Sequence, residues 1–339
     1  MPFYNTEEER IASLATLDPE GREYVIQRAK EYMAAANLHP SIFAQFIGYG
    51  DSTMRHFLRG AYHRISGNDM VLRRKVLAFI DANPVLPATD DGFHLYETEN
   101  ATTLRKWFDH CLGIGKKRGR LIPVYAGPGS GKTDIARHLI AELNSKYLLD
   151  TTRPRAFYIY CSQNERPLTL TTKMMHAVGL RAYATIYNNL TSLRFHLRHS
   201  RTLFVLDEAQ HLSYACLEHV RELCDLPPHF GVLALGSHAL RKFFEQNAAQ
   251  TEQWSSRHRK SVELPGDSRE TVARIVREQL AGIMSFEGDK GEERLHKLLD
   301  RCEVDDKFSR TNRRYISMRR VFDAIEDVKD RDAQKVTVQ

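Results

Sequence analysis

The chain has 339 residues, 42% of them hydrophobic, and its 49 Lys and Arg residues outnumber its 43 Asp and Glu residues. No apolar run approaches eighteen residues and the first ten residues are acidic, so we expect neither a membrane span nor a signal peptide. The five cysteines have neither paired nor metal-ligand spacing, which predicts reduced thiols and no structural zinc. The small basic excess favours polyanionic partners without identifying one.

Residues 1–83 are expected to form an all-α domain, because apolar residues recur through most of this region with helical periodicity. Within it, Ala44, Gly48 and Met54 have the spacing of a helix-turn-helix unit. The small Ala44 side chain lets two helices approach, Gly48 permits a tight turn, and Met54 packs the second helix inward. The sequence therefore predicts an N-terminal helix-turn-helix domain.

The outer face of the second helix in this unit is polar and basic. Such a surface suits contacts with DNA phosphates and with the major groove. The alternative is a helical protein-interaction module with a solvated basic face. The residues expected to contact DNA are Ser52, Thr53, Arg55, His56 and Arg59.

A linker is expected over residues 84–100, where Pro, Gly and Asp interrupt the helical pattern. A helix from about Ala101 to Leu112 follows and leads through a basic loop to a short apolar strand that begins at Arg120. The domain boundary therefore lies ahead of this helix.

The strand runs directly into the glycine-rich turn AGPGSGKT, residues 126–133, and an apolar-periodic helix follows. Its three glycines let successive backbone N–H groups point at a polyphosphate, as in a P-loop. We expect Lys132 to neutralise the β- and γ-phosphates and the Thr133 hydroxyl to hold Mg²⁺. Ala126 stands where such loops usually have their first glycine, which removes some backbone freedom. The loop residues expected to bind nucleotide are Gly127, Pro128, Gly129, Ser130, Gly131, Lys132 and Thr133.

A second nucleotide motif is the buried apolar run RTLFVLDE, residues 201–208, which ends in two acids. As a Walker B strand, it predicts that Asp207 binds the nucleotide's Mg²⁺ together with Thr133, and that Glu208 polarises the attacking water. The alternative is a core strand followed by a surface acid pair. The absence of an Asn-Lys-x-Asp guanine motif favours ATP over GTP.

Further apolar runs predict strands at 155–161, 231–236 and 261–265. Because strands alternate with helices, we expect an α/β fold with a five-stranded parallel sheet over residues 101–265. Helical patterns then predict a C-terminal helical lid over 266–330 without strands, followed by a frayed tail over 331–339.

These motifs, together with the runs DEAQ, LGSH, SRHR and TNRR, resemble AAA+ P-loop ATPases. Within them, the resemblance is to the DNA-transposition ATPases of the MuB, TnsC, TniB and IstB kind, and the N-terminal helix-turn-helix favours the MuB branch. The resemblance places Ser237 at the sensor 1 position and Arg314 at the sensor 2 position. It places Arg257, with Arg259 as the alternative, at the arginine finger that reaches a neighbouring subunit's ATP.

The resemblance implies an ATPase, with ATP and Mg²⁺ as cofactors, that oligomerises as a ring or helical filament on double-stranded target DNA. It would recruit or activate a transposase, and hydrolysis would disassemble it. Lys173 belongs to a second basic region that would face the DNA. The alternatives are an ATP-switched transcription or replication-initiation regulator and a phage-defence or helicase-loader ATPase. The implied location is the cytoplasm of a bacterium, at the nucleoid, for a bacterial or phage-encoded protein.

Overall fold

The computed structural model describes residues 19–36, 38–66, 69–85, 95–112, 120–147, 155–197, 201–224, 230–246, 261–306 and 314–337. Its centre is a five-stranded sheet with the order β2-β3-β4-β1-β5, in which every neighbouring pair is parallel. The strands are β1 (Arg120–Tyr125), β2 (Arg155–Tyr160), β3 (Thr202–Asp207), β4 (Phe230–Gly236) and β5 (Val262–Glu263). The predicted five-stranded parallel sheet is confirmed.

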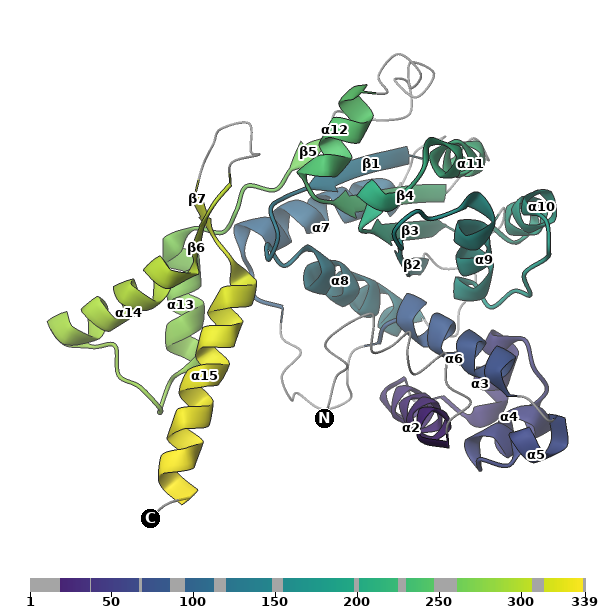
Figure 1. The fold of residues 1–339 in the computed structure, drawn as a ribbon, viewed down its shortest axis with the longest axis horizontal. Helices are drawn as coiled ribbons and strands as arrows, with labels where there is room; N and C mark the ends of the chain where they lie inside the picture. Colours follow the sequence, from purple (N-terminus) through teal and green to yellow (C-terminus); the bar gives the residue numbers. More distant parts are fainter. Residues whose placement is uncertain are drawn as a thin grey trace.

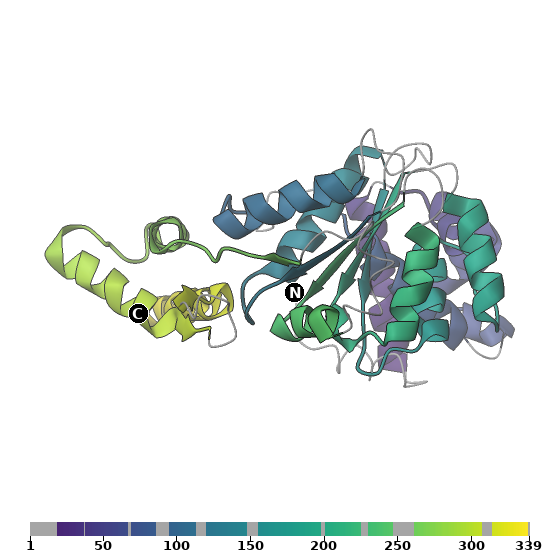
Figure 2. The same ribbon diagram turned by 90° about the horizontal axis from the view of Figure 1, so that it is seen from above.

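Helices cover both faces of this sheet (Figure 1, Figure 2). In β3, Leu203 and Val205 join one apolar core, whereas Phe204 and Leu206 join the other, as the alternation of side chains along a strand requires. The helices on the first face are α7 (Glu99–Leu112) and α8 (Lys132–Tyr147). Those on the second face are α9 (Pro167–Ala177), α10 (Ile186–Leu197), α11 (Tyr214–Cys224) and α12 (His238–Gln246). The carboxyl ends of the parallel strands therefore meet along one edge, where α/β sheets bind their ligands.

The N-terminal region is a helical module with an apolar core of its own. Its helices are α2 (Pro19–Ala35), α3 (Pro40–Ile47), α4 (Asp51–Leu58), α5 (Tyr62–Ser66) and α6 (Met70–Ala82). Helix α3 ends at Gly48, whose φ of 74° lies in the left-handed region that glycine adopts without a steric penalty. Ala44 and Met54 are fully buried on either side of this turn.

This module packs directly against the central α/β core, where α6 contacts α9. Asn83 is fully buried; its side-chain amide donates to the Ala177 carbonyl oxygen at 2.9 Å and accepts from Arg155 at 3.3 Å. A Cβ atom at Gly179 would overlap the Phe46 carbonyl oxygen, so the two backbones are in close contact there. The expected linker at 84–100 thus begins directly after Asn83, which holds the module to the core. Helix α7 begins inside this expected linker, at Glu99.

The described part of the lid contains the helices α13 (Arg269–Gln279), α14 (Gly288–Cys302) and α15 (Met318–Thr337). Between α14 and α15, β6 (Glu303–Asp305) and β7 (Arg314–Ile316) pair as antiparallel strands. The prediction that no strand follows residue 266 was wrong, because three-residue strands are too short to show a periodicity. Helix α15 continues to Thr337, into the segment 331–339 that we expected to be a frayed tail. None of the described helices is long and apolar enough to span a membrane.

Candidate nucleotide-binding site

A cavity of about 510 Å³ lies at the carboxyl edge of the sheet, between the P-loop, the lid and the segment that precedes α7. The P-loop and the first turn of α8 form its polar side. Apolar and aromatic side chains from segments before and after the P-loop form another wall: Leu95, Tyr96, Ile135, Met318 and Phe322. This combination of a polar loop and an apolar wall suits a ligand with phosphates at one end and a flat base at the other.

The P-loop has the backbone that its glycines predict. Gly129 and Gly131 have φ angles of 76° and 77°, and α8 begins at Lys132, so the amino end of a helix points at the cavity. The Lys132 ammonium donates to the Ala126 and Gly127 carbonyl oxygens at 3.3 and 3.1 Å. Burial lowers the pKa of Lys132, and the neighbouring carboxylates oppose that shift. The ammonium is thus held inside the loop, where phosphate oxygens would replace the carbonyls.

The two residues predicted to hold Mg²⁺ lie side by side. The Thr133 hydroxyl donates to Asp207 at 2.7 Å, and the Asp207 side chain is buried. Asp207 also accepts from the Tyr158 hydroxyl at 2.7 Å and from the Glu208 backbone N–H at 2.9 Å. A hydroxyl and a carboxylate are oxygen ligands of the kind that Mg²⁺ takes together with waters and phosphates, so the pair fits this ion.

Tyr158, which belongs to no sequence motif, fixes the Asp207 carboxylate from the neighbouring strand. The parallel register of β2 and β3 carries both residues to the same edge of the sheet. Burial raises the pKa of Tyr158 well above its ordinary value, so its hydroxyl stays protonated and donates. Only the strand pairing, which the sequence does not show, reveals this contact.

Glu208 has a strained backbone and a fixed side chain. Its φ of 53° lies in the left-handed region, which a residue with a side chain seldom adopts. The Gln210 side-chain N–H donates to the Glu208 carboxylate, and the Gln210 oxygen accepts from the Ser237 backbone N–H at 3.1 Å. A Cβ atom at Gly236 would lie 2.5 Å from that Gln210 oxygen, so only glycine leaves room for it. Gln210 therefore ties Glu208 to the end of β4.

We expect Gln210→Ala to lower kcat for ATP hydrolysis about tenfold while leaving ATP affinity unchanged, because it frees the Glu208 carboxylate without touching the P-loop. Steady-state kinetics and direct nucleotide binding measure the two effects separately. A variant with wild-type kcat would show that Gln210 does not position Glu208.

Ser237 directly follows β4, at the edge where the cavity lies. Its hydroxyl accepts from the Ala239 backbone N–H at 3.3 Å and so stabilises the start of α12. This placement is compatible with the sensor 1 position, and that role stays a prediction.

The lid packs directly on the P-loop. The Tyr315 hydroxyl donates to the Pro128 carbonyl oxygen at 2.6 Å, and the Arg319 backbone N–H donates to the Gly129 carbonyl oxygen at 3.4 Å. A Cβ atom at Gly127 would lie 2.5 Å from the Tyr315 hydroxyl oxygen. Gly127 is therefore required for the close approach of the lid, in addition to its role in the loop.

Arg319, on the first turn of α15, lines the cavity. Arg314 was predicted for the sensor 2 role, but it lies on β7, is 72% exposed and pairs with Asp305 at 2.9 Å and Glu303 at 4.0 Å. Arg319 and its neighbour Arg320 lie on α15, whereas Arg314 lies on β7. The position of a lid arginine that reaches the nucleotide therefore fits Arg319 and not Arg314.

The predicted DNA contact at Lys173 is opposed by its surroundings. Its ammonium donates to the Tyr160 carbonyl oxygen at 2.8 Å, to the Ser162 hydroxyl at 3.1 Å and to Glu165 at 2.6 Å. The Glu165 side chain is fully buried, so its negative charge holds this lysine in place.

The predicted arginine finger, Arg257, and its alternative, Arg259, lie outside the described residues. Their role stays a prediction.

Residues 116–244 match the family model described as an AAA domain. No curated protein sequence matches the chain. Similar solved structures include Aeropyrum pernix ORC2 in ADPNP–ADP complexes, with a TM-score of 0.45 and 15% identity, covering 72% of this chain and 69% of that chain. Drosophila ORC bound to DNA has a TM-score of 0.47 and 15% identity, covering 77% and 61%. Aeropyrum pernix ORC1 in complex with DNA has a TM-score of 0.48 and 16% identity, covering 72% and 62%.

The matched segment carries the P-loop, the acidic end of β3 and the four strands β1 to β4. Residues 116–244 are therefore similar to an AAA domain, and they lie within a chain that has an α/β fold with a five-stranded parallel sheet.

Proposed function

We propose that the chain binds ATP with Mg²⁺ and hydrolyses it. The observation that carries this proposal is the convergence of Lys132, Thr133 and Asp207 at one end of a cavity whose other wall is apolar. The phosphates would lie in the P-loop and the adenine against the apolar wall. Mg²⁺, held by Thr133 and Asp207, would neutralise the phosphate oxygens. Glu208, which also lines the cavity, would take the proton of the attacking water.

The basic face of α4 supports DNA as the partner. Ser52, Arg55 and Arg59 are exposed, and Thr53 and His56 are half-buried. Arg55 pairs with Asp51 at 2.9 Å, but this pair is solvent-exposed and a DNA phosphate can displace it at small cost.

Because the helical module is anchored to the core through Asn83, DNA on α4 would be held in a fixed relation to the nucleotide site. A change in the core on nucleotide binding would then act on the DNA contact through this anchor.

The specific role that we propose is target selection in DNA transposition: the protein assembles on duplex DNA with ATP, recruits or activates a transposase, and is released by hydrolysis. This role is supported by the resemblance of its motifs to the MuB-like ATPases. The assembly would place Arg257 of one subunit at the γ-phosphate of the next, where a cation stabilises the transition state.

We expect the double variant Arg55→Ala/Arg59→Ala to bind duplex DNA more weakly and with a smaller salt dependence. Each lost phosphate contact lowers the slope of log K against log salt by roughly 0.9, so the expected change is about 1.8. Fluorescence anisotropy at several salt concentrations, in the presence of ATP, measures it. The matched control is Arg294→Ala, which removes an exposed arginine from lid helix α14. If the double variant and Arg294→Ala had equal slopes of log K against log salt, α4 would not be part of the DNA interface.

A further inference from the structure

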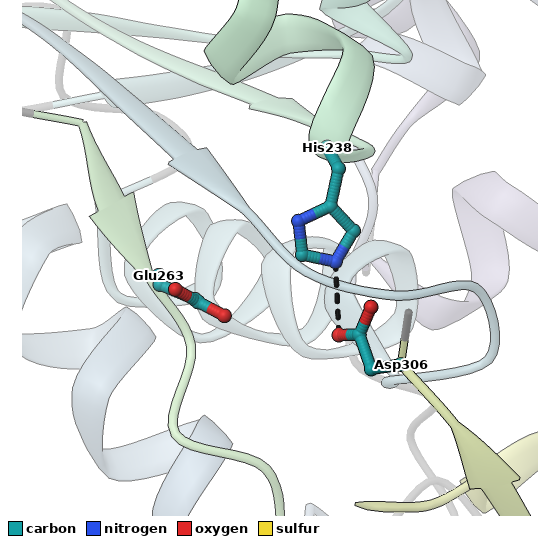
Figure 3. A group of neighbouring side chains, drawn as sticks. All are labelled: His238, Glu263 and Asp306. Carbon is teal, nitrogen blue, oxygen red and sulfur yellow. Dashed lines mark hydrogen bonds and ion pairs between the residues drawn. The ribbon is translucent and has the colours of Figure 1, made fainter. Parts of the chain in front are cut away.

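Three side chains with metal-ligand chemistry converge where the core meets the lid, and the proposed ATPase function uses none of them (Figure 3). They are His238 at the start of α12, Glu263 at the end of β5 and Asp306 directly after β6. One potential ligand atom from each lies within 4.8 Å of the other two. His238 Nε2 lies 2.9 Å from an Asp306 oxygen.

The donors lie in a protected position. His238 is 5% exposed and Asp306 is 7% exposed, whereas Glu263 is half-buried. Figure 3 shows the Glu263 carboxylate directed toward the pair formed by the other two. Three segments far apart in the sequence thus present one nitrogen and two carboxylates to a common point.

A single core residue, Tyr125, contacts two of the three donors. Its hydroxyl donates to a Glu263 oxygen at 3.3 Å, and its ring lies edge-on to the His238 imidazole with the centroids 5.4 Å apart. The pairing of β1 with β5 sets Tyr125 opposite Glu263, and Tyr125 is fully buried. Outer contacts that orient ligands in this way are characteristic of metal centres.

Charge also favours a cation at this point. The two carboxylates attract a divalent ion, and burial strengthens that attraction. Imidazole and carboxylate are ligands that Zn²⁺ accepts at about 2.0–2.2 Å, with a fourth position left for water. Ligand atoms around one such ion are about 3.4 Å apart, so shifts of roughly 1–2 Å would let these donors, which lie within 4.8 Å of one another, surround it.

We propose that His238, Glu263 and Asp306 form a Zn²⁺ site that fastens the lid to the core. The site has no cysteine ligand, so the cysteine spacing, from which we expected no structural zinc, does not reveal it. Two ligands belong to the core, and the third, Asp306, belongs to the lid, where it directly follows β6, the strand that pairs with β7. Strand β7 carries Tyr315, which contacts the P-loop at Pro128. A bound ion therefore stabilises the arrangement in which the lid covers the nucleotide cavity.

Isothermal calorimetry of the nucleotide-free full chain titrated with Zn²⁺ tests the proposal. We expect one equivalent of Zn²⁺ to bind to the wild type, and Asp306→Asn and His238→Gln each to weaken that binding by about hundredfold or more. Tyr125→Phe, which removes only the hydroxyl contact to Glu263, is expected to weaken it about 10–100-fold. The matched control Asp207→Asn, which alters the Mg²⁺ site instead, should bind Zn²⁺ as the wild type does.

A second measurement keeps the test valid if a variant folds poorly. Zn²⁺ should raise the Tm of the wild type and of Asp207→Asn, and it should slow hydrogen exchange in β6 and β7. Wild-type zinc affinity in both Asp306→Asn and His238→Gln would show that His238 and Asp306 form an ion pair only. The wild type can also be loaded with Co²⁺ and its absorption spectrum recorded. Thiolate charge-transfer bands in this spectrum would show that cysteines bind the metal, and would also overturn the proposal.

Discussion

The Glu208→Gln variant is expected to bind ATP with wild-type affinity and to hydrolyse it about 10²–10⁴-fold more slowly, the range that a general base contributes. The substitution keeps the shape of the side chain and an oxygen that can accept from Gln210, but it removes the group that takes the proton of the attacking water. Phosphate release under saturating ATP measures the rate, and a fluorescent ATP analogue measures the affinity.

The contrasting variant is Lys132→Ala, which removes the cation that the P-loop encloses. We expect it to weaken ATP binding by about 10²-fold, since a hydrogen bond to a charged group contributes about 1.5–3 kcal/mol. Its circular dichroism spectrum should match that of the wild type. If Glu208→Gln hydrolysed ATP at the wild-type rate, another group would be the base.

Arg319→Ala is expected to lower kcat/KM for ATP about 10²–10³-fold, the loss seen when one donor to a developing negative charge is removed. We expect this loss because Arg319 lies on the first turn of α15, where its side chain lines the cavity together with the P-loop. Steady-state ATPase kinetics measure the change.

Arg314→Ala is the matched control for this variant. Its side chain is 72% exposed and pairs with acids of the lid itself, so its loss should change ATP hydrolysis by less than about twofold. The opposite ranking of the two variants would restore Arg314 as the lid arginine that couples to the nucleotide.

The central sheet and the nucleotide motifs could be predicted from the sequence because these features are local. In β3 all six residues are buried, so a continuous apolar run marks the strand and its acidic end marks the Mg²⁺ position. The P-loop glycines are likewise a local signal, because the loop backbone needs φ angles that glycine adopts without a steric penalty.

The features that the sequence did not predict depend on contacts between distant segments. Tyr158 reaches Asp207 only because β2 pairs with β3 in register, and Tyr315 reaches Pro128 only because the lid folds back on the loop. From the sequence, Lys173 was predicted to contact DNA because it belongs to a basic region. The fold instead places the buried carboxylate of Glu165 beside it. The sequence shows which residues are charged, but tertiary packing decides which residue pairs with each of them.

The central claim, that ATP drives assembly of this protein on DNA, is tested most directly by electron microscopy of Glu208→Gln with ATP and long duplex DNA. Because this variant should retain ATP, the assembly should persist long enough to be imaged. We predict continuous helical assemblies along the duplex with ATP, and none with ADP or with Lys132→Ala. Isolated particles at a few DNA sites, or assemblies that form equally with ADP, would contradict the claim.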